Sequence, residues 1–136
     1  MSDEHHVEIG SLLARADASL RAAELLCTEK LYDDCASRAY YAAFYGASAL
    51  ILSRALKYRK HGQVLGAVHR DFVKPGLLAS AHGKNLNWLF ELRAVGDYGE
   101  IRHVESQDAR EAIHVALSFL KEVRRLCIGK LSDPPC

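Results

Sequence analysis

Apolar residues recur every three or four positions along most of the chain, and this is the period of an amphipathic helix. The pattern predicts helices over residues 7–27, 32–56, 63–73 and 85–95, and from residue 106 to about residue 127. No stretch alternates apolar and polar residues in the way of a β-strand. We therefore expect an all-α fold, an up-and-down bundle of four to five helices. Residues 1–136 are expected to form a single domain that ends in a frayed tail at residues 131–136.

The expected helix boundaries rest on residue types that favour helix ends and turns. Aspartates suit the first turn of a helix, and glycine suits its left-handed end. The signals are Asp33 and Asp34 at the start of the second helix, Pro75-Gly76 at a turn, Gly96 and Gly99 at a left-handed helix end, and Ser106 at an N-cap. Residues 77–84 are expected to be irregular.

Residues 37–47 are apolar on nearly every side of the expected helix. Small side chains at Ala39, Ala42 and Ala43 let neighbouring backbones come close, while aromatic rings fill the space between helices. A helix that is apolar all round is buried. The stretch is therefore predicted to be the spine of the bundle, sealed from water from Tyr40 to Ala47.

Composition narrows the class of protein. The chain has 136 residues, 49% of them hydrophobic, and a net charge of +1, so it is not an electrostatic nucleic-acid binder as a whole. Its four cysteines form no C-x-x-C pair and have no histidine at metal-site spacing, so we expect reduced core cysteines, no metal and no cofactor. The acidic start Met1–Glu4 and the lack of a long apolar run favour a cytoplasmic protein without a membrane span.

The strongest cluster of charge runs from Arg54 to Lys74. Six cations stand there against one acid, which gives a local charge of +5 (six minus one). A phosphate-bearing partner would find complementary charge. A solvated helix end, whose cations suit the negative end of the helix dipole, explains the same pattern. The ligand-binding candidates in this stretch are Arg54, Lys57, Arg59, Lys60 and His61.

A second group of polar residues follows the helix expected over residues 85–95. Arg93 lies in its last turn, with Asp97 and Tyr98 just beyond. Arg93 and Asp97 together form a plain structural clamp in one interpretation. In the other, the guanidinium and the phenol face a groove and contact RNA phosphates. No histidine has a nucleophile-and-base signature, so these residues alone leave enzymatic activity open.

Four segments, in order, resemble the HEPN superfamily, and the closest likeness is to its small stand-alone prokaryotic domains. They are Ser37-Arg38-Ala39-Tyr40-Tyr41-Ala42-Ala43-Phe44-Tyr45, Lys57-Tyr58-Arg59-Lys60-His61, Phe72-Val73-Lys74, and Leu92-Arg93 with Gly96-Asp97-Tyr98. The resemblance implies a four- to five-helix bundle that forms a homodimer. It also implies a metal-independent ribonuclease, or a toxin that is paired with a minimal nucleotidyltransferase antitoxin. In some toxin members that partner adenylylates a tyrosine of the motif region, which Tyr98 would match here.

The family's ribonuclease motif is an arginine, four to six residues, and then a histidine. Arg93 matches the arginine by position, but Tyr98 and Gly99 stand where the histidine belongs, and the next histidine is His103. The catalytic candidates implied by the resemblance are therefore Arg93, Tyr98 and His103. Arg54 and His61 have the motif's spacing at the end of the second helix, and we interpret that match as coincidence.

Three hypotheses follow. In the first, the chain is a HEPN homodimer that acts as a binding module for a nucleotidyltransferase partner, for RNA or for a nucleotide. It would then be one half of a toxin–antitoxin pair. Its groove would be lined by Arg93, Asp97, Tyr98 and the basic stretch. In the second, the chain is a divergent ribonuclease toxin in which Arg93 holds the scissile phosphate. In the third, it is a structural helical adaptor without a chemical role.

Overall fold

The chain folds into α-helices joined by short connections. The computed structural model describes residues 3–131, and within this range it contains no strand. The helices are α1 (Asp3–Thr28), α2 (Tyr32–Leu52), α3 (His61–Val68), a π-helical turn η1 (His69–Val73), α4 (Ser80–Tyr98) and α5 (Ser106–Leu131). The all-α prediction is confirmed. Of the tail expected at residues 131–136, all but Leu131 lies outside the described residues.

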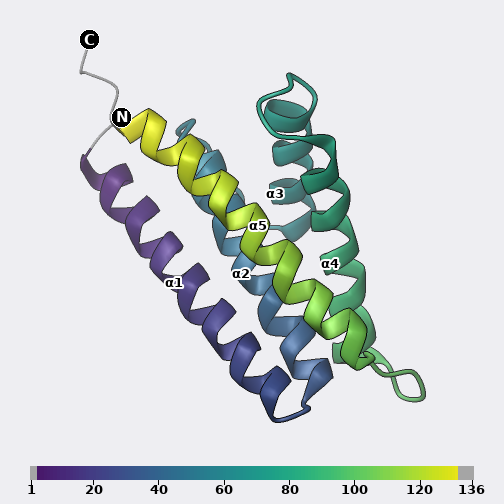
Figure 1. Cartoon of the computed structure of the whole chain (residues 1–136). Coiled ribbons are helices and arrows are strands. Elements are labelled where there is room, and N and C mark those ends of the chain that lie inside the picture. Colours follow the sequence, from purple (N-terminus) through teal and green to yellow (C-terminus); the bar gives the residue numbers. More distant parts are fainter. Residues whose placement is uncertain (1–2, 132–136) are drawn as a thin grey trace.

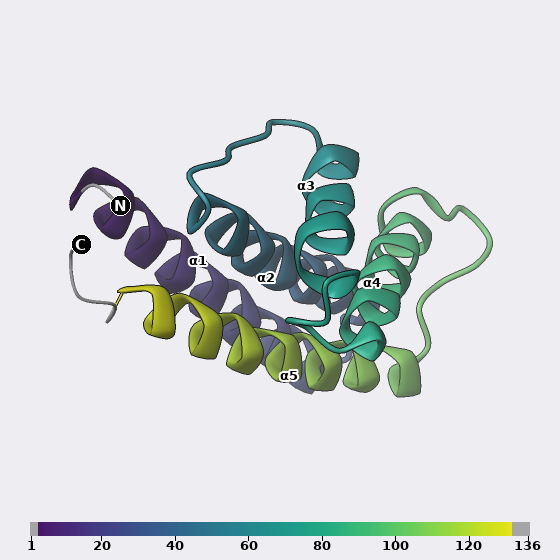
Figure 2. The same cartoon turned by 90° about the horizontal axis from the view of Figure 1, so that it is seen from above.

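The long helices α1, α2 and α5 run side by side, and α3 and α4 stand on the side of the bundle away from α1 (Figures 1 and 2). α2 lies at the centre. Most of its residues are buried, and Tyr40, Ala42, Ala43 and Ala47 are 0% exposed. The predicted central spine is therefore confirmed, but its complete seal from Tyr40 to Ala47 is not, because Tyr41, Phe44 and Tyr45 keep partial exposure. A Cβ at Gly46 would lie 2.5 Å from Cδ2 of Leu120, so the missing side chain lets α2 and α5 approach closely.

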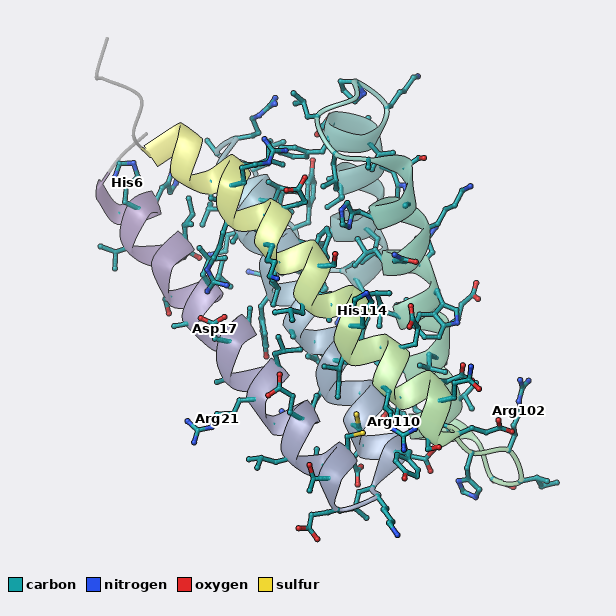
Figure 3. All side chains as sticks on the ribbon, viewed as in Figure 1. His6, Asp17, Arg21, Arg102, Arg110 and His114 are labelled. Carbon is teal, nitrogen blue, oxygen red and sulfur yellow. The ribbon has the colours of Figure 1, made fainter. Side chains whose placement is uncertain are left out.

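Half-buried aromatic rings extend the spine toward its neighbours. The rings of Tyr41, Phe44 and Tyr45 keep partial exposure, while small residues fill the buried side of α2. An ion pair on the surface joins the outer helices α1 and α5. Arg124 of α5 donates to Asp17 of α1 over 2.5 Å, and Figure 3 shows Asp17 on the part of α1 that faces the bundle. α3 and α4 pack against α2 on another side.

The predicted end of the second helix at residue 56 is wrong, because α2 ends at Leu52. Ala55 takes a left-handed conformation with φ 59°, and the Leu56 N–H closes the turn on the Ile51 carbonyl at 3.2 Å. Glycine usually marks such a turn, and an alanine gives no signal for it. The early end releases residues 53–60 as a loop that carries the chain to α3.

The expected irregular stretch at residues 77–84 is confirmed for residues 77–79 and wrong from residue 80 onward, and the expected left-handed end at Gly96 and Gly99 is also wrong. α4 begins at Ser80 and continues to Tyr98, and Gly99 is extended with φ −74°. Gly96 instead permits a close approach, since a Cβ there would lie 2.8 Å from the Asp33 carbonyl oxygen. The turn at Gly76 is confirmed by its φ of 87°. Ser106, the predicted N-cap, is instead the first residue of α5, so the cap position falls one residue earlier.

Three cysteines lie at helical positions as free thiols, with Cys35 and Cys127 buried and Cys27 half-buried. Burial raises the pKa of Cys35 to about 12 and that of Cys127 to about 11. Thiols with such a high pKa are protonated near neutral pH and behave as small hydrophobic side chains. Cys136 lies outside the described residues.

Candidate functional site

Polar and aromatic residues from three helices meet where α3 and α4 cross α2. We call this group the Arg93 cluster, and its members are Tyr40, Tyr41, Phe44, His61, Phe90 and Arg93. α2 supplies the first three rings, the first residue of α3 supplies the histidine, and α4 supplies Phe90 and the arginine. The fold therefore joins two of the separate candidate groups, the basic stretch and the last turns of α4, at one place.

The Arg93 guanidinium packs against aromatic faces. Its central carbon lies 5.1 Å from the ring centroids of both Tyr40 and Phe90, which is the geometry of a cation–π contact. Nη1 donates to the Tyr41 hydroxyl at 3.4 Å and lies 3.7 Å from a carboxylate oxygen of Asp97. The side chain is 13% exposed, and its buried Nε has no hydrogen-bond partner. These contacts leave several of the five guanidinium N–H groups without an acceptor.

His61 stacks on the rings of α2. Its ring centroid lies 4.2 Å from that of Phe44, with 17° between the planes, and 5.7 Å from that of Tyr40. Desolvation, followed by the positive charge of Arg93, lowers the pKa of His61. Both effects disfavour the imidazolium form, so His61 is neutral at pH 7.

The Tyr40 hydroxyl determines which nitrogen of His61 carries the proton. Tyr40 is 0% exposed, and its oxygen lies 2.6 Å from Nδ1 of His61, its one hydrogen-bond partner in the described chain. Burial, partly offset by Arg93, raises the pKa of Tyr40, so the phenol keeps its proton. A buried hydroxyl donor is normally satisfied. Tyr40 therefore donates to Nδ1, which leaves the proton of the neutral ring on Nε2 as an N–H donor.

Asp97 and Tyr98 occupy different environments. Asp97 forms the expected clamp with Arg93, one helical turn away. Tyr98 ends α4 with 73% of its surface exposed, and no hydrogen bond joins its phenol to another described residue. It therefore stands outside the Arg93 cluster and faces solvent.

His103 lies apart from Arg93. Its Nδ1 is 2.7 Å from one carboxylate oxygen of Asp33, and the Val104 N–H donates to the other at 2.7 Å. The exposed loop before α5 projects from the bundle, and Figure 3 shows Arg102 of that loop extending away from the helices. The sequence-based pairing of Arg93 with His103 is not found, and His61 is the histidine beside Arg93.

Internal contacts occupy part of the basic stretch. Lys57 pairs with Glu8 of α1 at 2.6 Å, and the Arg54 guanidinium lies 4.9 Å from the centroid of Phe72. Arg59 and Lys60 are exposed and make no ion pair with a described residue. Of the cations expected to bind a ligand here, these two keep their charge toward solvent.

Sequence reasoning missed the polar roles of Tyr40 and Tyr41, since their spacing on α2 fits a core position equally well. It also missed Arg38, which is exposed on α2 and makes no hydrogen bond or ion pair within the described part of the chain.

Among the described residues, no group of three or more His, Cys, Asp or Glu side chains could hold a metal ion. No described helix is both long enough and apolar enough to span a bilayer.

Comparison with known proteins identifies the fold's family. The model of the HEPN domain matches residues 9–126. The chain belongs to the HEPN family. A UPF0332 protein of Thermotoga maritima is 39% identical over 112 residues, which cover 82% of this chain and 85% of that protein.

Two further HEPN relatives come from Methanocaldococcus jannaschii. "Putative toxin MJ0605" is 33% identical over 118 residues, 87% of each chain. "Putative toxin MJ0142" is 29% identical over 123 residues, which cover 90% of this chain and 84% of that protein. The resemblance inferred from the tyrosine-rich segment and the Arg93 turn is confirmed, and the relatives connect this HEPN chain with toxin-like proteins.

Proposed function

We propose that this HEPN protein is a toxin-type binding module that engages RNA at the Arg93 cluster. The observation that carries the proposal is that Arg93 and His61, from helices far apart in the sequence, present N–H donors at one place on α2. An RNA phosphate accepts hydrogen bonds from both kinds of donor. The family match and the toxin names of two relatives support the same conclusion.

The charge state of the two donors favours phosphate binding. Arg93 carries a permanent positive charge and keeps unoccupied N–H groups. His61 is neutral, so its Nε2–H adds a donor without adding a second cation next to Arg93. A phosphate at this position would compensate the charge of Arg93 more fully than the contact with Asp97 at 3.7 Å does.

Binding of short single-stranded RNA tests the proposal. His61→Asn places an acceptor where Nδ1 receives the Tyr40 hydrogen bond but removes the Nε2 donor, while His61→Gln retains a donor near Nε2. We expect Arg93→Lys and His61→Asn each to weaken binding about tenfold, the effect of losing a hydrogen bond to a charged group. His61→Gln is expected to bind RNA more tightly than His61→Asn. Wild-type protein that binds no RNA would overturn the proposal, as would folded variants with unchanged affinity.

RNA cleavage is the second candidate function, and it is favoured because a neutral histidine and Arg93 both pack against the ring of Tyr40. In that reaction the ribose 2′-oxygen bonds to phosphorus while the bond from phosphorus to the 5′-oxygen breaks. Nε2 of His61 takes the 2′-hydroxyl proton, the 5′-oxygen gains a proton from solvent, and Arg93 stabilises the charge at phosphorus. The step requires the other tautomer, in which Nδ1–H donates to Tyr40. Cleavage without added metal, lost in His61→Gln, would support it.

Partners follow from the family membership as further proposals. A homodimer and a minimal nucleotidyltransferase partner fit the toxin–antitoxin interpretation, and the exposed phenol of Tyr98 is open to a modifying enzyme. Light scattering of the purified chain gives its mass. Co-purification with a nucleotidyltransferase encoded by a neighbouring gene tests the second partner, and Tyr98→Phe is expected to prevent any modification by it without changing the melting temperature.

A further inference from the structure

One side of α2 stays open to solvent beside the Arg93 cluster. Between residues 35 and 52 of α2, the positions that keep exposure form one helical stripe and are 37, 38, 41, 44, 45 and 48. α5 packs on the opposite side, where Gly46 meets Leu120. Figure 2 shows α2 from above, with α5 on one side and the loop of residues 53–60 on the other. Arg38 is exposed on this stripe and the other five positions are half-buried, with Tyr41 and Phe44 also in contact with the His61 ring of α3.

A hollow of about 330 Å³ lies on this stripe. Leu26 of α1 and Asp34, Ser37, Arg38 and Tyr41 of α2 line it. The hydroxyl of Tyr41 accepts a hydrogen bond from Nη1 of Arg93 at 3.4 Å. Tyr41 is thus a wall shared by the hollow and the Arg93 cluster, so a ligand that fills the hollow reaches the neighbourhood of Arg93.

The two charged residues of the hollow, Asp34 and Arg38, do not form an ion pair with each other. Asp34 and Arg38 stand one helical turn apart, at a spacing that commonly supports an ion pair. Both are exposed, and neither makes a hydrogen bond or an ion pair with any side chain that the structure describes. A carboxylate and a guanidinium are therefore available to a ligand on the same face of α2.

The mixture of groups fits a nucleobase with its attached phosphate. Unpaired RNA bases stack on aromatic rings and form hydrogen bonds through their edges. The ring of Tyr41 and the side chain of Leu26 supply apolar walls, and Arg38 can contact a phosphate. The Asp34 carboxylate repels phosphate but accepts hydrogen bonds from the N–H groups of a base. Guanine offers two adjacent N–H donors, which match the two carboxylate oxygens, whereas uracil offers one.

We propose that the hollow is a base subsite that holds an unpaired guanine. Asp34 accepts hydrogen bonds from the N–H groups of this base, and Arg38 contacts the adjoining phosphate. The inference rests on the proposed function, because it places this base next to the RNA phosphate at Arg93. It adds a preference for guanine that neither the family match nor the relatives' names assign. A free guanine nucleotide has the same chemistry, so the test separates it from RNA.

The test compares a labelled uridine hexamer with the same hexamer carrying one guanosine, by fluorescence anisotropy at fixed salt. Wild-type protein is expected to bind the guanosine-containing RNA about tenfold more tightly, the discrimination of one bidentate pair. Asp34→Asn should reduce this preference to about twofold or less while binding of the uridine hexamer is retained. Arg38→Gln should weaken binding of both RNAs alike and reduce the salt slope by about 0.7, the value for one phosphate contact with a single strand.

Two variants on α5 are matched controls. Asp108, like Asp34, is an aspartate in the first turn of a helix, so Asp108→Asn removes the same interaction with a helix dipole. Arg110→Gln removes an exposed guanidinium, and Figure 3 shows Arg110 on α5. Both controls should retain the wild-type preference for guanosine.

The outcomes separate the subsite from the proposed function. Equal affinity of wild-type protein for the two hexamers, with binding still dependent on Arg93, overturns the subsite alone. No binding of either RNA overturns both. Competition by free guanosine monophosphate at micromolar concentration would identify a nucleotide rather than RNA as the occupant and contradict the RNA subsite. A dimer that Arg38→Gln converts to monomer would show that a second copy covers the hollow, which also contradicts it.

Discussion

The Tyr40 hydroxyl and Nδ1 of His61 lie 2.6 Å apart, although 21 positions separate the two residues in the sequence. This hydrogen bond joins α2 to the first residue of α3 and orients the imidazole beside Arg93. Tyr40→Phe removes the donor without changing the ring's packing. We expect the free energy of unfolding to fall by about 1 kcal/mol. Urea denaturation measures the loss.

Tyr41→Phe is the control for that prediction, because the Tyr41 hydroxyl is half-buried and its contact with Arg93 is longer, at 3.4 Å. Its effect on stability should be smaller. Nitrogen chemical shifts of the His61 ring provide a second measurement, since the proton is expected on Nε2 in the wild type. An unchanged tautomer and unchanged stability in Tyr40→Phe would show that the hydroxyl does not orient His61.

The stability of the fold should depend on pH through His61. Desolvation and the nearby Arg93 charge hold the pKa of His61 below its ordinary value of 6.5. Between the folded and unfolded pKa values the unfolded chain binds more protons, so stability is greatest above pH 6.5 and falls as the pH decreases below it. The melting temperature of the wild type should drop more between pH 7.5 and pH 5.5 than that of His61→Gln. Identical pH profiles would contradict a neutral His61.

Gly96 should be intolerant of a side chain because of the α2 backbone, not because of its own conformation. A Cβ there would lie 2.8 Å from the Asp33 carbonyl oxygen, which belongs to the first turn of α2. We expect Gly96→Ala to lose about 1–3 kcal/mol of stability, in the range of overpacked sites.

Gly10 of α1 is the matched control, since nothing lies within 4 Å of the position its Cβ would take. Gly10→Ala should stabilise the helix by about 0.5–1 kcal/mol because alanine loses less backbone entropy on folding. Thermal denaturation compares the two variants. A stable Gly96→Ala protein would mean that α2 and α4 are farther apart than the structure places them.

The basic stretch should contribute to RNA binding through those of its cations that form no ion pair with a described residue. Arg59 and Lys60 are exposed, whereas Lys57 pairs with Glu8. Neutralising Arg59 and Lys60 together is expected to reduce the slope of log affinity against log salt by about 1.4, or 0.7 for each charge on a single strand. Lys57→Gln should change the slope less. A slope unchanged by the double substitution would assign this stretch to a solvated loop.

Local patterns in the sequence predict much of the fold. The helical period locates α1 and α5, and the run of small and aromatic residues predicts the buried centre of α2. The end of α2 could not be predicted, because Ala55 takes a left-handed conformation that carries no residue signal. Gly96 has an ambiguous signal, since a helix end and a close approach both favour glycine.

The candidate site is harder to predict because it arises from helix crossing. The next histidine after Arg93 along the chain is His103, which lies beyond the motif's spacing, and Asp33 holds it at the start of α2. His61 reaches Arg93 only because α3 folds back across α2, and no pattern in the sequence reports that crossing. The Arg93–Asp97 clamp is local, one turn of one helix, and it could be predicted for that reason.

A double-mutant cycle on RNA affinity tests the central claim, that Arg93 and His61 form one RNA-binding site. Arg93→Lys, His61→Asn and the double variant are compared with wild type, with melting temperatures recorded to confirm folding. Residues that bind one ligand and share a packing partner, here the Tyr40 ring, are coupled. The loss in the double variant should therefore differ from the sum of the single losses by at least about 0.5 kcal/mol. Strictly additive losses, or wild-type affinity in all folded variants, would contradict it.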